Sequence, residues 1–160
     1  MQHYKTSLVD EAATFALGAA LANHLQPGLV MYLHGDLGAG KTALTRSILR
    51  AAGHQGLVKS PTYTLAEPYT ISVQGQRLKL MHFDLYRMIS ADEFIEAGFR
   101  DELNGETICI VEWPEKAEGI LPTPDLEIWI SILDQGRAVE LQALSERGQR
   151  CLLALDLPSN

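Results

Sequence analysis

Two cysteines are all that this chain of 160 residues contains. Cys109 lies inside an apolar run and Cys151 stands far from it, so the sequence indicates neither a metal-ligand spacing nor a disulfide framework. No apolar run approaches the roughly 20 residues that a helix needs to cross a bilayer, and the first residues do not resemble a signal peptide. We therefore expect a cytoplasmic protein with no membrane partner.

Basic residues are also scarce. The chain has 13 Lys and Arg against 20 Asp and Glu, a formal net charge of −7. This balance argues against an extended basic surface that holds nucleic acid by itself, so we expect any RNA to be held by another protein. The length fits one domain, residues 1–160, with a sizeable hydrophobic core.

One motif is present in full. GDLGAGKT, residues 35–42, has the P-loop spacing G-x-x-x-x-G-K-[ST]. Its glycines admit backbone angles that are closed to residues with a Cβ, so the loop can point several N–H groups at an anion. Lys41 would reach the β- and γ-phosphates of a nucleotide, and the Thr42 hydroxyl would ligand Mg²⁺.

The surroundings of the motif separate a nucleotide site from a plain glycine-rich turn. Residues 29–33 have the pattern of a buried strand, and residues 43–52 that of a helix stopped by Gly53. Strand, loop and helix thus follow in the order that a P-loop requires, which favours the nucleotide site. No Asn-Lys-x-Asp tetrapeptide is present to read guanine, so ATP is favoured over GTP.

The rest of the chain alternates between the two kinds of secondary structure. We expect a helix from Ser7 to about Leu25, a hairpin of strands at 63–71 and 77–84, a short helix from Ser90 to Gly98, a buried strand at 107–111, a second hairpin around 126–132 and 139–143, and a final helix to Leu157. This pattern predicts an α/β fold of the P-loop NTPase type, with helices flanking a central sheet of mixed parallel and antiparallel strands.

Two acidic residues end apolar strands. Asp84 closes the run at 78–83, and Glu112 closes the run at 108–111. In open α/β sheets ligands lie beyond the carboxyl ends of the strands, so both carboxylates could face the phosphates and a metal ion. The alternative is that each is a solvated acid at a strand end. The sequence leaves open which of the two would ligand Mg²⁺ directly.

Three further residues have two interpretations each. Thr62, after the P-loop helix, is either a switch threonine that senses the γ-phosphate or an ordinary turn hydroxyl. His82 alternates with Asp84 along one strand face, where a hydrogen-bonded structural histidine is favoured over a catalytic base. Trp113 is either a core residue or a contact for a nucleotide or a partner.

Two charged residues could bind the rest of a nucleotide. Glu11 could accept a hydrogen bond from the adenine amino group, and Arg137 could lie against the base or a phosphate. Composition alone would make both of them ordinary surface charges.

Four segments together resemble a known family. GDLGAGKT, KSPTYTL at 59–65, HFDLYR at 82–87 and IVEWPEK at 110–116 are similar to the TsaE (YjeE) family of bacterial P-loop ATPases. The resemblance extends from about Asp10 to the GRAVEL segment at 136–141. It implies an ATPase needed with TsaB, TsaC and TsaD to make N6-threonylcarbamoyladenosine beside the anticodon of tRNA. In that family TsaE binds the TsaB–TsaD pair, its ATP hydrolysis supports repeated turnover, and its contact with tRNA is indirect.

The resemblance also implies roles for individual residues. The phosphates would be held by the P-loop residues Gly38, Ala39, Gly40, Lys41 and Thr42, and Leu37 would also bind the nucleotide. Thr42 and Glu112 would ligand Mg²⁺, and Asp84 would be the Walker B-like acid. Thr62 would be the switch threonine, and Glu11 and Arg137 would contact ATP.

Two alternatives to a partner-dependent ATPase remain. A small P-loop kinase shares the motif but normally adds an arginine-bearing lid, and the sequence shows no arginine-rich helical insertion. A nucleotide-dependent binding protein, whose hydrolysis is incidental, would carry the same motifs.

Overall fold

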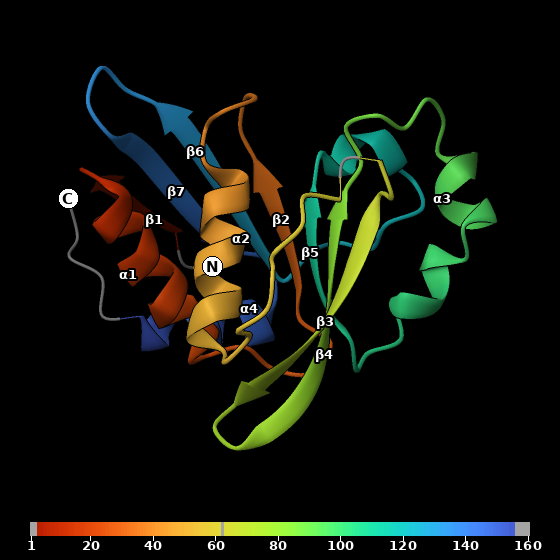
Figure 1. Ribbon diagram of the computed structural model, residues 1–160, viewed down its shortest axis with the longest axis horizontal. Helices are drawn as coiled ribbons and strands as arrows, with labels where there is room; N and C mark the ends of the chain where they lie inside the picture. The colour runs from red at the N-terminus through yellow and green to blue at the C-terminus, as the bar shows by residue number, and fades with distance from the viewer. Residues whose placement is uncertain (1–2, 62, 156–160) are drawn as a thin grey trace.

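A seven-stranded sheet organises the computed structural model, which describes residues 3–61 and 63–155. The strand order is β1-β7-β6-β2-β5-β4-β3 (Figure 1). The strands are β1 His3–Leu8, β2 Val30–His34, β3 Ala66–Val73, β4 Gln76–Asp84, β5 Ile108–Glu112, β6 Leu126–Ile132 and β7 Arg137–Ala143. The helices are α1 Glu11–Ala22, α2 Lys41–Ala51, α3 Asp92–Glu96 and α4 Glu146–Ala154, with 3-10 turns η1 Phe99–Glu102 and η2 Pro114–Ala117.

The centre of the sheet is parallel and its margins are antiparallel. β2 pairs in parallel with both β5 and β6, and β5 pairs in parallel with β4. The outer pairs β3–β4, β6–β7 and β1–β7 are antiparallel. The predicted α/β fold with a mixed sheet is therefore confirmed, and the carboxyl ends of β2, β4 and β5 meet at one edge of the sheet.

Each face of the sheet has its own hydrophobic core. On one face α1, α2 and α4 contribute Leu21, Ile48 and Leu152, all fully buried against the strands. On the other face α3 contributes Phe94, which packs against Phe83 of β4. Figure 1 shows α1 and α2 side by side in front of the sheet and α3 at the opposite end of the molecule. β5 is buried along its whole length because helices or turns cover both of its faces.

The first strand is where the sequence prediction was wrong. Ser7, predicted to start a helix, lies in β1 and pairs with Ala138 of β7. α1 begins after Asp10, whose Oδ1 accepts a hydrogen bond from the Ala13 N–H at 2.9 Å. β1 is an edge strand with little buried surface, so its residues carry a weak pattern, and its pairing depends on a strand more than 120 residues away.

Smaller differences concern where elements begin and end. β3 begins at Ala66, after a turn, instead of at Tyr63. α4 extends to Ala154, and the predicted continuation to Leu157 runs into residues outside the described part of the chain. Gly98, predicted to stop the short helix, does so with a positive φ of 77°.

Both cysteines are buried and unpaired. Burial raises the pKa of the Cys109 thiol, and likewise that of Cys151, to about 12. Both therefore act as small apolar residues, as the sequence predicted for Cys109. Within residues 3–61 and 63–155, every helix is too short or too polar to cross a bilayer.

Candidate nucleotide-binding and catalytic site

The P-loop turns between the end of β2 and the start of α2. Gly38 and Gly40 have φ angles of 81° and 112°, which a residue with a Cβ adopts only with strain. Gly40 is the N-cap of α2, and it has no side chain to cap the helix. The N–H groups of the first turn of α2 therefore remain for an anion, together with the positive end of the helix dipole.

Two cavities flank this loop. The first, the Lys41 cavity, has a volume of about 280 Å³ and is lined by Leu37, Lys41, Thr42, Asp84, Glu112 and Trp113, among others. The second, the Arg137 cavity, has a volume of about 390 Å³ and is lined by residues of β1, α1, β6 and β7. Gly38, Gly40 and Ala43 border both cavities. An elongated ligand could therefore lie across the loop, with one end in each cavity.

Lys41 lies in the first cavity with its charge already partnered. Its Nζ donates a hydrogen bond to the Gly35 carbonyl at 2.5 Å and lies 3.8 Å from the centroid of the Trp113 ring. Burial lowers the pKa of Lys41, while the neighbouring Glu112 and Asp84 act in the opposite direction. The ammonium group is thus held in a buried, acidic surrounding beside the P-loop.

Asp84 and Glu112 lie at adjacent strand ends and are opposite each other in the β4–β5 register. Both are buried, with relative exposures of 8% and 2%. Burial raises the pKa of Asp84, against the effect of the hydrogen bond that its Oδ1 accepts from the Tyr86 N–H at 3.1 Å. The two carboxylates predicted from separate strands are therefore brought together.

The donor atoms of this cavity fit Mg²⁺ bound together with phosphate. The Thr42 hydroxyl and the carboxylates of Asp84 and Glu112 all belong to residues that line it. Mg²⁺ prefers oxygen ligands and is usually held by one or two carboxylates together with phosphates and water. In the described part of the chain no group of three or more His, Cys, Asp or Glu side chains forms a metal site. The arrangement therefore suits a Mg²⁺ ion whose remaining ligands are phosphate oxygens and water.

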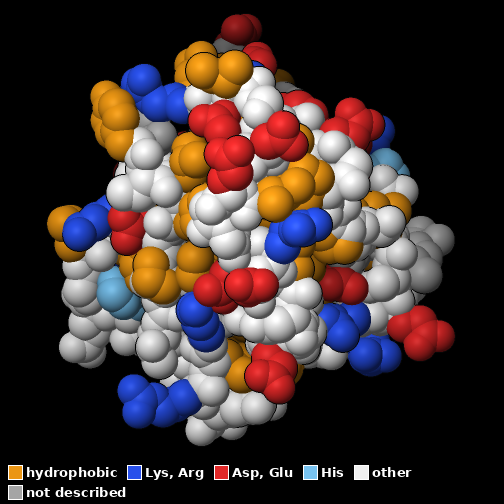
Figure 2. Space-filling view, turned by 90° about the vertical axis from the view of Figure 1, so that its right-hand side faces the viewer, with side chains coloured by type: hydrophobic (Ala, Val, Ile, Leu, Met, Phe, Trp, Pro, Cys, Tyr) orange, Lys and Arg blue, Asp and Glu red, His pale blue; other side chains and the backbone are white. Residues whose placement is uncertain are grey.

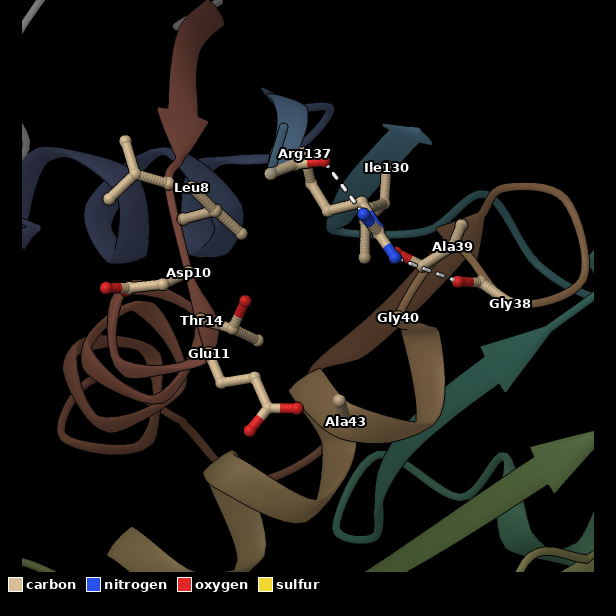
Figure 3. Close-up of a pocket in the computed structure, with 12 residues that line it drawn as sticks. Leu8, Asp10, Glu11, Thr14, Gly38, Ala39, Gly40, Ala43, Ile130 and Arg137 are labelled. Carbon is tan, nitrogen blue, oxygen red and sulfur yellow. Dashed lines mark hydrogen bonds between the residues drawn. The ribbon is translucent and has the colours of Figure 1, made fainter. Parts of the chain in front are cut away.

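Glu11 and Arg137 line different walls of the second cavity (Figure 3). Arg137 lies along the P-loop, where its Nε donates to the Ala39 carbonyl at 2.9 Å and its Nη2 to the Gly38 carbonyl at 3.4 Å. Glu11 extends from the start of α1. Leu8 and Ile130 add apolar surface against which a flat heterocycle could pack. Glu11 adds a carboxylate that can accept a hydrogen bond from such a ring.

Comparison with known proteins matches most of the chain to one family. The family model described as "Threonylcarbamoyl adenosine biosynthesis protein TsaE" matches residues 8–139. The chain belongs to the TsaE family. A tRNA threonylcarbamoyladenosine biosynthesis protein TsaE of Haemophilus influenzae is 41% identical over 159 residues, covering 96% of this chain and 98% of the relative. Its namesake in Bacillus subtilis is 35% identical over 148 residues, covering 92% and 90%.

A solved structure of a similar protein has the same fold. The crystal structure of YdiB from Bacillus subtilis superposes with a TM-score of 0.77 at 31% identity, covering 96% of this chain and 94% of that one. The resemblance predicted from the four sequence segments is therefore confirmed at the level of family and fold.

Most of the residues predicted from the TsaE pattern line one of the two cavities. Leu37, Gly38, Gly40, Lys41, Thr42, Asp84 and Glu112 line the first, and Glu11, Gly38, Ala39, Gly40 and Arg137 line the second. Thr62 lies outside the described residues, so its role stays a prediction. Trp113, whose place the sequence left open, is half-buried between Lys41 and Tyr86.

The sequence did not indicate several neighbours of the site. Thr14 and Leu8 line the Arg137 cavity, and Ser60 lines the Lys41 cavity. The position of Thr14 could have been inferred, because it is one turn after Glu11 on the same helix. Leu8 could not, because nothing in its own segment shows that β1 pairs with β7.

Proposed function

We propose that this chain is an ATPase that acts in the formation of N6-threonylcarbamoyladenosine in tRNA. The observation that carries the proposal is the Lys41 cavity, where a P-loop lysine and threonine meet acids from two adjacent strand ends. The names of its TsaE relatives support the pathway. The absence of a guanine-reading Asn-Lys-x-Asp tetrapeptide supports ATP as the nucleotide.

ATP would lie across the P-loop, with its phosphates in the Lys41 cavity and its base in the Arg137 cavity. Lys41 would exchange its hydrogen bond to the Gly35 carbonyl for one to the β- or γ-phosphate, where the N–H groups at the start of α2 also point. Thr42 and Glu112 would hold Mg²⁺. When bound, Mg²⁺ would supply positive charge that offsets the charge developing on the phosphate oxygens.

Asp84 suits the handling of the attacking water. In hydrolysis the water oxygen forms a bond to the γ-phosphorus, the bond to the bridging oxygen of ADP breaks, and the water loses a proton. Burial raises the pKa of Asp84, which makes its carboxylate a better proton acceptor than an exposed aspartate. Asp84 would orient the water and accept that proton, and Thr62 would sense the γ-phosphate.

The substrate of the pathway would be held by other proteins, which we propose are TsaB and TsaD. A net charge of −7 does not favour direct binding of tRNA. Figure 2, which faces the α3 end of the molecule, shows acidic, basic and hydrophobic side chains intermixed, with no continuous basic area on that face. The chain would thus bind tRNA only indirectly, as a nucleotide-driven subunit of a larger assembly.

The deciding experiment measures ATP hydrolysis by this chain alone and with the TsaB–TsaD pair, each with and without tRNA. Modified tRNA would be quantified in the same reactions over several turnovers. We expect the pair to stimulate hydrolysis, and we expect Glu112→Gln to abolish both stimulated hydrolysis and repeated tRNA modification while it still binds the pair. Glu106→Gln, at an exposed position outside both cavities, is the matched control and should match the unmodified chain.

Two outcomes would contradict the proposal. Undiminished multiple-turnover modification by Glu112→Gln would make hydrolysis incidental and the chain a nucleotide-dependent binding protein. Transfer of phosphate from ATP to a small molecule instead of to water would make it a kinase.

A further inference from the structure

A histidine lies next to Glu112, outside the Lys41 cavity. His82 is fully buried, and its Nε2 lies 2.5 Å from Glu112 Oε2. The side chains of the pair have relative exposures of 0% and 3%. Glu112 lines the Lys41 cavity, and His82 does not. His82 thus contacts the carboxylate from the interior of the protein.

The register of the strands produces this contact. His82 is opposite Ile110 in the parallel β4–β5 pair, and Glu112 comes two residues after Ile110 on the same face of β5. Leu80, two residues before His82, is fully buried in the core shared with α2. His82 therefore lies on the same strand face as Asp84, between the two acids and the apolar core that contains Leu80.

The second ring nitrogen fixes which tautomer makes the bond. His82 Nδ1 is buried and has no hydrogen-bond partner among the described residues. A proton on Nδ1 would be a buried donor without an acceptor, which is unfavourable. A proton on Nε2 is instead donated to Glu112 Oε2, so this tautomer makes the contact a hydrogen bond from the ring to the carboxylate.

We propose that His82 is a positioning residue, which holds Glu112 by Oε2 so that the other oxygen, Oε1, faces the Mg²⁺ position. This inference rests on the proposed function. A carboxylate with one oxygen already in a hydrogen bond loses less rotational freedom when its other oxygen binds a cation. Hydrogen bonds to ligating carboxylates commonly set metal affinity.

Three substitutions at position 82 separate positioning from packing. His82→Leu fills similar space without a donor, His82→Gln offers an amide N–H near the place of Nε2, and His82→Asn is too short to reach Glu112. ATP affinity would be measured for each in EDTA and in a Mg²⁺ titration. We expect His82→Leu and His82→Asn to weaken Mg²⁺ binding to the ATP complex by about 10- to 100-fold and to leave metal-free ATP affinity within about twofold. His82→Gln should retain most of the Mg²⁺ affinity.

The readouts keep the inference testable if one variant does not fold. If thermal unfolding shows that His82→Leu is unfolded, the comparison of His82→Gln with His82→Asn decides. Unchanged Mg²⁺ affinity in His82→Asn, or an equal loss of affinity in EDTA, would overturn the positioning role. ¹⁵N shifts of the His82 ring in the unmodified protein give an independent readout, because a ring protonated on Nδ1 alone has no Nε2 proton to donate and would overturn the positioning role.

This result can be told apart from failure of the proposed function. If the unmodified chain binds no ATP, or binds it without any dependence on Mg²⁺, the proposed function fails together with the inference. If the unmodified chain shows both and the variants at position 82 match it, only the role of His82 is wrong.

Discussion

The two cavities beside the P-loop are built in different ways. The Lys41 cavity lies at the ends of parallel strands in the middle of the sheet, and its charged residues Lys41, Asp84 and Glu112 are at most 8% exposed. The Arg137 cavity is bordered by the antiparallel margin of the sheet, and its Glu11 is exposed. Charges act more strongly on one another in a buried site than in water. Under the proposed function, this difference suits the first cavity to charge-dependent chemistry and the second to recognition of the base.

The largest effect should come from the acid with the raised pKa. Asp84→Asn keeps the size of the side chain but removes the proton acceptor, so hydrolysis should fall by about 10²- to 10⁴-fold with ATP binding retained. Phosphate release and ATP affinity, measured on the same preparation, check this. Asp134→Asn, in the exposed β6–β7 turn, is the control. Equal hydrolysis by Asp84→Asn and the control would remove Asp84 from the mechanism.

Asp84→Asn should lower the rate of hydrolysis but raise the stability of the fold at pH 7. The pKa of Asp84 is raised in the folded protein, so as pH increases from the ordinary aspartate value of 3.8 the unfolded chain loses this proton first, and stability falls. Asp84→Asn should therefore raise the melting temperature at pH 7, by about 2–4 °C for each kcal/mol, and the gain should vanish below the ordinary value. Thermal unfolding at several pH values measures it, and a gain that grows toward low pH would contradict it.

The second-largest effect is expected from the ammonium group of Lys41. Lys41→Ala removes a charged hydrogen-bond donor to the phosphates, so ATP affinity should fall by about 10- to 100-fold. ADP should lose affinity as well, because the lysine also reaches the β-phosphate. Calorimetric titration of both nucleotides measures this. Lys79→Ala, which removes an exposed lysine paired with Glu102, should bind like the unmodified chain. Unchanged ATP affinity in Lys41→Ala would exclude this cavity as the phosphate site.

Arg137 tests whether the two cavities are coupled. Its guanidinium donates to the carbonyls of Gly38 and Ala39, so Arg137→Met should loosen the P-loop and weaken ATP binding by about tenfold. An equal loss of ADP affinity would indicate an effect on the P-loop, because ATP and ADP would place their β-phosphates at the same position. Arg77→Met, at an exposed position in β4, serves as the control. A variant with full affinity would show that the loop is held without Arg137.

The smallest effect is expected at the exposed end. Glu11→Gln should reduce the preference for ATP over GTP by about fivefold, since one hydrogen bond contributes about 1 kcal/mol. Competition between the two nucleotides for binding measures the preference. Glu146→Gln, at the start of α4 and outside this cavity, is the control. If Glu11→Gln leaves the preference unchanged but weakens both nucleotides, Glu11 does not read the base.

Local patterns predicted the parts of the site that are continuous in the chain. The loop at 35–42, the strand before it and the helix after it follow from residues next to one another, and the structure has all three. Asp84 and Glu112 were predicted near the phosphates because each ends an apolar strand, and the β4–β5 register places them opposite each other. β1 was missed because an edge strand with one weakly buried face has little hydrophobic pattern of its own.

The sequence by itself determined the P-loop between strand and helix, the mixed α/β fold and the family, because these depend on glycine spacing and on apolar runs that act locally. Only the tertiary structure decided that Arg137 reaches the P-loop carbonyls from 98 residues away and that His82 contacts Glu112 from the next strand. Such contacts depend on strand order and register, which follow from the packing of the whole sheet. The physical reason is that hydrogen bonds between distant segments form only after both segments have been placed by the core.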